Sequence, residues 1–244
     1  MMYENLSNLE LMKVFESLES HTDDVVRKRI EAFIRKEKKL QGVLWEIIQL
    51  LVSIVERKDP YASYHHQEMC ILACYVAEGL GMSKEQVDGV CMAGMLHDIG
   101  KINLPDELFR KVGRLSEDEQ KLMNTHPQLG FEILKKIDFP GPVATIVLQH
   151  HEKMDGSGYP SGLSGDEIVP EARILCVTAA VEAMTSPRSY RPAFSISDAL
   201  KEISGKNGIL YDSSVVEVCK KALFRQLTPG NLISKTVSTR GAFS

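Results

Sequence analysis

Almost the whole chain carries the hydrophobic periodicity of α-helices, and this constrains its fold more than any other feature. Apolar residues recur at a period of about 3.6 residues in segment after segment, without the alternation that β-strands show. Residues 116–119 (SEDE) form a capping box, which marks the start of one helix. We therefore predict an all-α protein. The expected helices cover residues 61–80, 84–97, 116–137, 142–151, 170–184, 197–203 and 213–224.

A long amphipathic pattern precedes these helices. It starts at a capping sequence, residues 22–24, and ends where Asp59-Pro60 stops the helix. Glu37 and Gly42 weaken its seven-residue repeat. The pattern indicates either a dimerising helix that passes signals into the following domain or a helix packed on its own domain. We favour the dimer, because four heptads exceed what a packing helix needs. The repeat comprises Val26, Ile30, Phe33, Leu40, Leu44, Ile47, Leu51 and Ile54.

We divide the chain into an N-terminal helical segment (1–57), a helical domain (58–224) and a C-terminal tail (225–244). With 244 residues, 43% of them hydrophobic, the chain is long enough to bury one substantial core. Its net charge of -4 argues against nucleic-acid and acidic-membrane partners. Glu46 and Gln49 interrupt the longest apolar stretch, so we expect no membrane span. The first residues, Met1 to Asn5, contain no basic region that leads into an apolar core, so we expect no signal peptide.

The chain has five cysteines, all of them within apolar stretches, and none forms a Cys-x-x-Cys pair. We interpret them as buried thiols, which favours a cytoplasmic protein. They are Cys70, Cys74, Cys91, Cys176 and Cys219.

Histidines next to a carboxylate give the strongest functional signal. His97-Asp98 is followed by Lys101, which shares a helix face with both at spacings of four and three. An imidazole, a carboxylate and an ammonium that meet there suit a divalent cation beside a bound phosphate. His150 and His151 diverge by about 100° around a helix, so two neighbouring ions bridged by Asp98 would use both. Two further histidines complete the predicted metal ligands: His65 and His126.

Three motifs resemble those of the HD-GYP family of bacterial phosphodiesterases: HDIGK from His97, HPQLG from His126 and HHEKMDGSGYP from His150. The match extends from about Asp59 to about Leu223. The resemblance implies an all-helical HD-domain bundle with a two- or three-metal centre, in which a metal-bound hydroxide hydrolyses cyclic di-GMP to pGpG or GMP. For this chain it implies one or two divalent ions, iron or manganese.

The same resemblance distributes the ligands between two ions. The first would take His65, His97, Asp98 and a further aspartate, and the second would take Asp98 with the other three histidines. Where the family has that further aspartate, this chain has Ala179. Glu182, one turn later, could reach toward the position of the absent aspartate. The family already carries an acidic residue there, so Glu182 is not obviously a replacement ligand. We expect weaker binding of the first ion.

The residues that the resemblance assigns to substrate are present. Lys101 would neutralise a phosphate oxygen and act with Asp98 in catalysis. Arg188 and Arg191 match the family's substrate clamp, and Tyr159 could stack or hydrogen-bond on a guanine. We also assign Glu182 to substrate binding.

Two functions of different classes remain open. The first is a working cyclic di-GMP phosphodiesterase. The second is a catalytically degenerate module that binds metal or the cyclic dinucleotide and acts through a signalling protein partner. Lys101 and Tyr159 suit both, whereas Ala179 argues against the first. A phosphatase acting on another small phosphoester is a weaker third interpretation.

Overall fold

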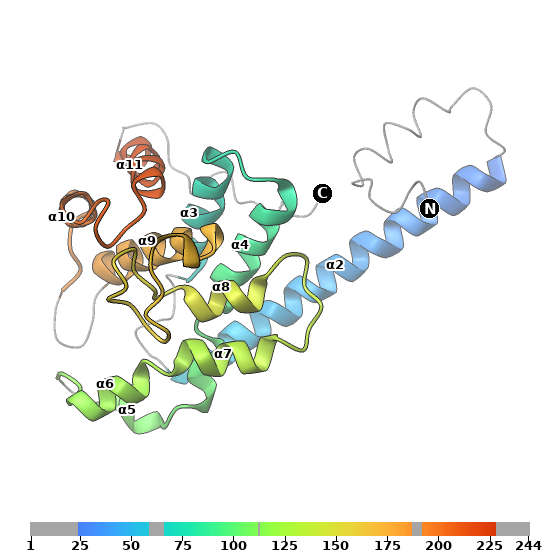
Figure 1. Cartoon of the computed structure of the whole chain (residues 1–244). Helices are drawn as coiled ribbons and strands as arrows, with labels where there is room; N and C mark the ends of the chain where they lie inside the picture. Colours follow the sequence, from blue (N-terminus) through green and yellow to red (C-terminus); the bar gives the residue numbers. More distant parts are fainter. Residues whose placement is uncertain (1–23, 59–65, 112, 187–191, 228–244) are drawn as a thin grey trace. The chain divides into compact units, whose positions relative to one another are not determined.

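The computed structural model describes residues 24–58, 66–111, 113–186 and 192–227 (Figure 1). Within these ranges it contains helices and two isolated β-bridges, but no strand, which confirms the predicted all-α class. The elements are α2 (Asp24–Lys58), α3 (His66–Gly79), α4 (Lys84–Leu96), η1 (Ile99–Asn103), α5 (Asp106–Arg110), α6 (Glu117–Met123), α7 (His126–Leu134), α8 (Val143–Gln149), η2 (Gly165–Glu167), α9 (Pro170–Thr185), α10 (Ile196–Gly205) and α11 (Ser213–Leu227).

Helix α9 is the centre of the helical domain, because it packs against α3, α4, α8, α10 and α11. Its residues Ala172, Ile174, Leu175 and Val177 are all inaccessible to solvent. A helix covered on several sides needs no polar face, so its sequence is apolar in most directions. Helix α4 is also buried, from Gly89 to Leu96, where it crosses α3, α8 and α9.

The helix predicted over residues 116–137 is two helices, α6 and α7, and that prediction is wrong at the break. Asn124 caps the end of α6, and α7 begins at His126 with Pro127 in its first turn. Proline lacks the N–H that would continue the helix and is tolerated only at a helix start. The break places His126 at a helix start instead of on a continuous helical surface.

Helix α2 is continuous from Asp24 to Lys58, but its residues belong to two compact units. The part of α2 up to Ile48 belongs to the first unit, and large apolar side chains are exposed on it: Phe33, Leu40, Val43, Leu44 and Ile47. In the second unit, which starts at Gln49, Val52 and Val55 are buried. No helix in the described ranges has a run of apolar residues sufficient to traverse a bilayer.

The prediction that all five cysteines are free thiols is wrong for Cys74 and Cys91, which form a disulfide between α3 and α4. These helices pack side by side, so the two Cα atoms lie 5.5 Å apart although the residues are 17 positions apart in sequence. The remaining cysteines are free and buried: Cys70, Cys176 and Cys219.

Candidate metal centre

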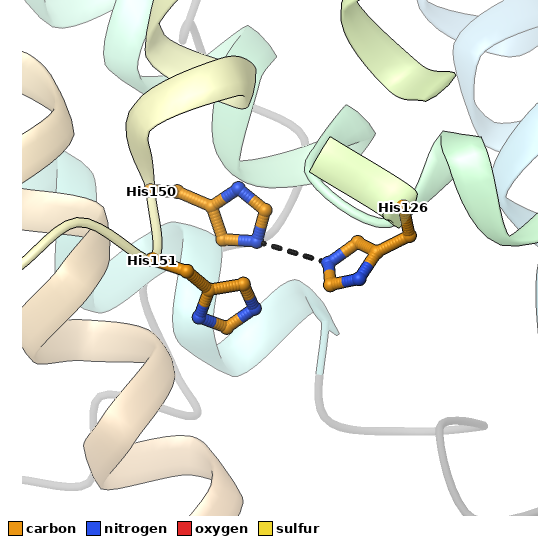
Figure 2. A group of neighbouring side chains, drawn as sticks. All are labelled: His126, His150 and His151. Atoms are coloured by element: carbon orange, nitrogen blue, oxygen red, sulfur yellow. Dashed lines mark hydrogen bonds between the residues drawn. The ribbon is translucent and has the colours of Figure 1, made fainter. Parts of the chain in front are cut away.

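Three histidine side chains from two places in the chain converge inside the helical domain (Figure 2). His126 starts α7, whereas His150 and His151 directly follow α8. One ring nitrogen from each lies within 4.8 Å of the others, and the Nε2 atoms of His126 and His150 are 3.3 Å apart. Helices α7 and α8 pack against each other, which brings the two ends together.

Backbone carbonyls fix how the rings are presented. The Nδ1 atoms of His97, His126 and His150 lie 2.7, 2.9 and 2.6 Å from the carbonyl oxygen three residues earlier in each case. Each Nδ1–H therefore donates to a carbonyl, so the lone pair of each of these rings is on Nε2, the nitrogen that would bind a metal. Metal-ligating histidines are usually oriented in this way.

The environment keeps the convergent histidines neutral. Burial lowers the pKa of His126 below its ordinary value of 6.5. Burial, reinforced by the neighbouring imidazoles, lowers the pKa of His150 and His151 well below that value. A metal ion binds only the neutral imidazole, so these histidines need not lose a proton to bind a cation at neutral pH.

Asp98 adds a carboxylate beside the imidazoles. Its Oδ1 lies 3.4 Å from His126 Nε2, and its Oδ2 lies 3.5 Å from His97 Nε2. Oδ2 also forms an ion pair with Lys101 Nζ at 2.7 Å. His97 and His150 meet edge to face, with ring centroids 5.3 Å apart. The structure thus brings Asp98 and Lys101 together with four of the five histidines that the sequence proposed as ligands.

The path of the chain through this motif differs from the prediction. We expected His97, Asp98 and Lys101 on one α-helix, but α4 ends at Leu96 and Lys101 lies on the 3-10 helix η1. A 3-10 helix has three residues per turn, so it places side chains at i and i+3 directly above each other. The expected Asp98–Lys101 contact therefore forms with different backbone geometry.

Two glycines permit the close packing on which the site depends. A Cβ on Gly100 would overlap the carbonyl oxygen of His126, so only glycine allows η1 to approach the start of α7. A Cβ on Gly158 would come within 2.5 Å of the backbone of Glu152 and Lys153. Gly158 therefore lets the Gly-Tyr-Pro loop fold back on the turn that carries the paired histidines.

Glu152 was missed by sequence reasoning, although its place beside the paired histidines was a signal. Its side chain is buried, and its two carboxylate oxygens accept the N–H groups of Ser161 and Leu163 at 2.7 and 3.0 Å. The loop thus held presents Tyr159, whose ring stacks on His151 with centroids 4.7 Å apart. Tyr159 thus packs against His151 of the histidine cluster. Its contact with a guanine stays a prediction.

Two of the other predicted residues lie on α9, and three lie outside the described residues. Ala179 and Glu182 are half-buried on α9, and Glu182 accepts a hydrogen bond of 2.8 Å from Ser186 Oγ at the end of that helix. His65, Arg188 and Arg191 lie outside the described residues, so their roles stay predictions.

The convergent imidazoles, one carboxylate and a helical frame define the class. Residues 49–215 match the HD domain family, and the chain belongs to it. Divalent metal binding is characteristic of that family, and the histidine cluster fits it. The HDIGK and HHEKMDGSGYP motifs place the chain in the HD-GYP branch, as do its relatives.

Two relatives have similar sequences over most of this chain. The cyclic di-GMP phosphodiesterase response regulator RpfG of Xanthomonas campestris is 40% identical over 174 residues, covering 70% of this chain and 46% of that protein. A cyclic di-GMP phosphodiesterase of Thermotoga maritima is 37% identical over 183 residues, with 74% and 50% covered. The chain thus spans about half the length of these relatives.

Solved structures share the fold at low sequence identity. Bd1817, an HDG"Y"P protein from Bdellovibrio bacteriovorus, aligns with a TM-score of 0.55 at 21% identity, covering 66% of this chain and 52% of that one. The HD domain of L. monocytogenes phosphodiesterase PgpH aligns with a TM-score of 0.53 at 20% identity, covering 72% and 96%. Both support the helical architecture.

Proposed function

We propose that this chain is a metal-dependent phosphodiesterase that hydrolyses cyclic di-GMP to pGpG or GMP. The observation that carries the proposal is the convergence of three neutral imidazoles, two of them buried and one half-buried, with Asp98 and Lys101. The names of RpfG and of the Thermotoga maritima relative support cyclic di-GMP as the substrate. A Vibrio cholerae relative, 30% identical over 189 residues, is named a 3'3'-cGAMP-specific phosphodiesterase, so a mixed cyclic dinucleotide is the competing substrate.

The chain supplies both the metal ligands and the groups that handle phosphate. His126, His150 and His151 would hold a divalent ion with Asp98, and His97 would contribute to a neighbouring position. A bound ion, iron or manganese, supplies Lewis acidity and lowers the pKa of a water molecule. Lys101 would neutralise a non-bridging phosphate oxygen, and its ion pair with Asp98 holds the ammonium beside the histidine cluster.

A catalytically degenerate module is the second candidate, because α9 has Ala179 where an aspartate ligand is expected. Such a module would bind a metal or the dinucleotide and act through a signalling partner. One experiment separates the two functions: metal analysis of the purified protein, together with turnover of cyclic di-GMP under anaerobic conditions with manganese or iron(II).

Two ions per chain and linear product would support the enzyme. One ion, no product and a gain of activity in Ala179→Asp would support the degenerate module. Arg188 and Arg191, the proposed clamp, are tested by substituting each with methionine, which should raise KM with little change in metal content.

We also propose that α2 pairs with a second copy of this chain. Its exposed apolar side chains follow a seven-residue repeat, which is the pattern of a helix that packs against an identical helix. Phe33, Leu40 and Ile47, each seven residues after the last, are 59%, 69% and 48% exposed, so they gain most from burial. Residues 1–57 would then form the dimerising segment, 58–224 the HD-GYP domain and 225–244 a tail. A monomeric mass at micromolar concentration in light scattering would refute the pairing.

A further inference from the structure

Lys58, the last residue of α2, reaches across to the backbone that follows the His-Asp motif. Its Nζ donates to the carbonyl oxygens of Ile102 and Leu104 at 2.8 and 2.6 Å. The same ammonium forms an ion pair of 3.1 Å with Asp106. These contacts connect positions 44 and 46 residues apart in sequence, so they are tertiary and not part of any helix.

The carbonyls that Lys58 binds belong to the end of η1, the short helix that carries Lys101. Within this turn the N–H of Lys101 donates to Asp98 O at 2.9 Å, and the N–H of Leu104 donates to Lys101 O at 3.0 Å. The last carbonyls of a helix have no partner inside it and need one from elsewhere. Lys58 supplies that partner for two of them, which fixes the end of the turn to α2.

Apolar packing of α2 adds to the same attachment. Val52 and Val55 line a small cavity together with Met95, Asp98 and Ile99, so α2 reaches the motif on its apolar side as well. On another side of η1, Gly100 contacts the start of α7 at His126. The turn is therefore held between α2 and α7, and Lys58 provides the polar contact on the α2 side.

We propose that Lys58 is a positioning residue for the Asp98–Lys101 pair. The contacts of Lys58 with Ile102, Leu104 and Asp106 hold the turn so that the carboxylate of Asp98 faces His126 while Lys101 faces that carboxylate. Without it, the carbonyls of Ile102 and Leu104 would turn to water, and the turn would gain freedom at the residues that bind metal and phosphate. The part of the proposal that concerns Lys101 and substrate rests on the proposed phosphodiesterase function, whereas the part that concerns Asp98 and metal does not.

The test compares Lys58→Met, which keeps the stem of the side chain and removes the donor, with Lys58→Arg, which restores it. Lys201→Met is the matched control, because Lys201 also pairs with an aspartate but is exposed on α10. In the 244-residue chain, manganese affinity is measured by competition with a chelator, and folding is followed by circular dichroism. We expect Lys58→Met to bind manganese roughly tenfold more weakly, which is typical of losing a residue that orients the metal ligands without contacting the metal. Lys58→Arg and Lys201→Met should bind like the wild type.

Turnover of cyclic di-GMP gives a second readout. Lys58→Met should lower kcat more than it changes KM, because a misplaced Lys101 loses stabilisation of the transition state. If the wild type shows no turnover, the proposed function fails while the manganese measurement still decides the role of Lys58. Manganese affinity equal to the wild type in folded Lys58→Met would overturn the proposal. If Lys58→Met does not fold, the comparison of Lys58→Gln with Lys58→Arg decides in the same way.

Discussion

Acid should unfold the metal-free protein at a pH set by its buried histidines. In the fold, burial holds the pKa of His126 below 6.5 and those of His150 and His151 well below it, whereas the unfolded chain has the ordinary value. The unfolded state therefore binds more protons as the pH falls. Stability that is complete above pH 6.5 is lost progressively below it.

The magnitude follows from the burial of each ring. At pH 5.5 an imidazole of pKa 6.5 is protonated about ten to one in the unfolded chain, so keeping it neutral in the fold costs about 1.4 kcal/mol. His150 is 0% exposed and its pKa lies well below 6.5, so it contributes close to that amount. His126, whose pKa is lowered, contributes up to the same amount, and so does His151. Acid thus removes on the order of 1–4 kcal/mol from the roughly 5–15 kcal/mol typical of a folded domain.

The assay is urea unfolding of chelator-treated protein at several pH values between 8 and 5.5, followed by circular dichroism. Saturating manganese should raise the stability at pH 8, because the folded state alone offers the assembled site. The gain should shrink at pH 5.5, where protons compete for the imidazoles. A free energy of unfolding that stays constant from pH 8 to 5.5 in the metal-free protein would show that these histidines are not buried in neutral form.

Two substitutions test the supports of the site. Gly100→Ala should lower the free energy of unfolding by about 1–3 kcal/mol and weaken manganese binding, because the new Cβ overlaps the His126 carbonyl. Gly205→Ala, where the Cβ meets nothing within 4 Å, is its control in the same urea and chelator assays, and equal losses in both would contradict the packing argument. Glu152→Gln should cost about 1–3 kcal/mol, because an amide cannot accept both loop N–H groups as the carboxylate does. An unchanged urea midpoint would refute that role.

The class of the fold was predictable because apolar periodicity is a local property of the sequence. Helix ends were less predictable, since they depend on single residues such as Pro127, which divides one expected helix into α6 and α7. The 3-10 geometry of η1 was not predictable, because it is fixed by tertiary contacts. Two residues that are distant from the turn in sequence hold it: Lys58, 44 positions before Ile102, and His126, whose carbonyl lies against Gly100.

The convergence of several predicted site residues could be expected from the sequence, but the residues that support them could not. Residue type alone identifies several candidates, and the structure brings them together: His97, Asp98, His126, His150 and His151. Residue type does not identify Glu152 or Lys58 as supporting residues, because a charged residue is usually a solvated surface group. Only the fold shows that Glu152 is buried under loop N–H groups and that Lys58 binds backbone carbonyls.

The charge balance of the site explains why an alanine instead of an aspartate at position 179 should affect metal binding. Among the described residues, the proposed ligands are neutral imidazoles and the carboxylate of Asp98, one oxygen of which already pairs with Lys101. One divalent ion beside that pair leaves an excess of positive charge, and a second ion would increase it in a poorly hydrated interior. An aspartate at position 179 would offset part of that excess, and so would the phosphates of a bound dinucleotide. Substrate and second ion should therefore favour each other's binding in this chain, and an added carboxylate should reduce that dependence.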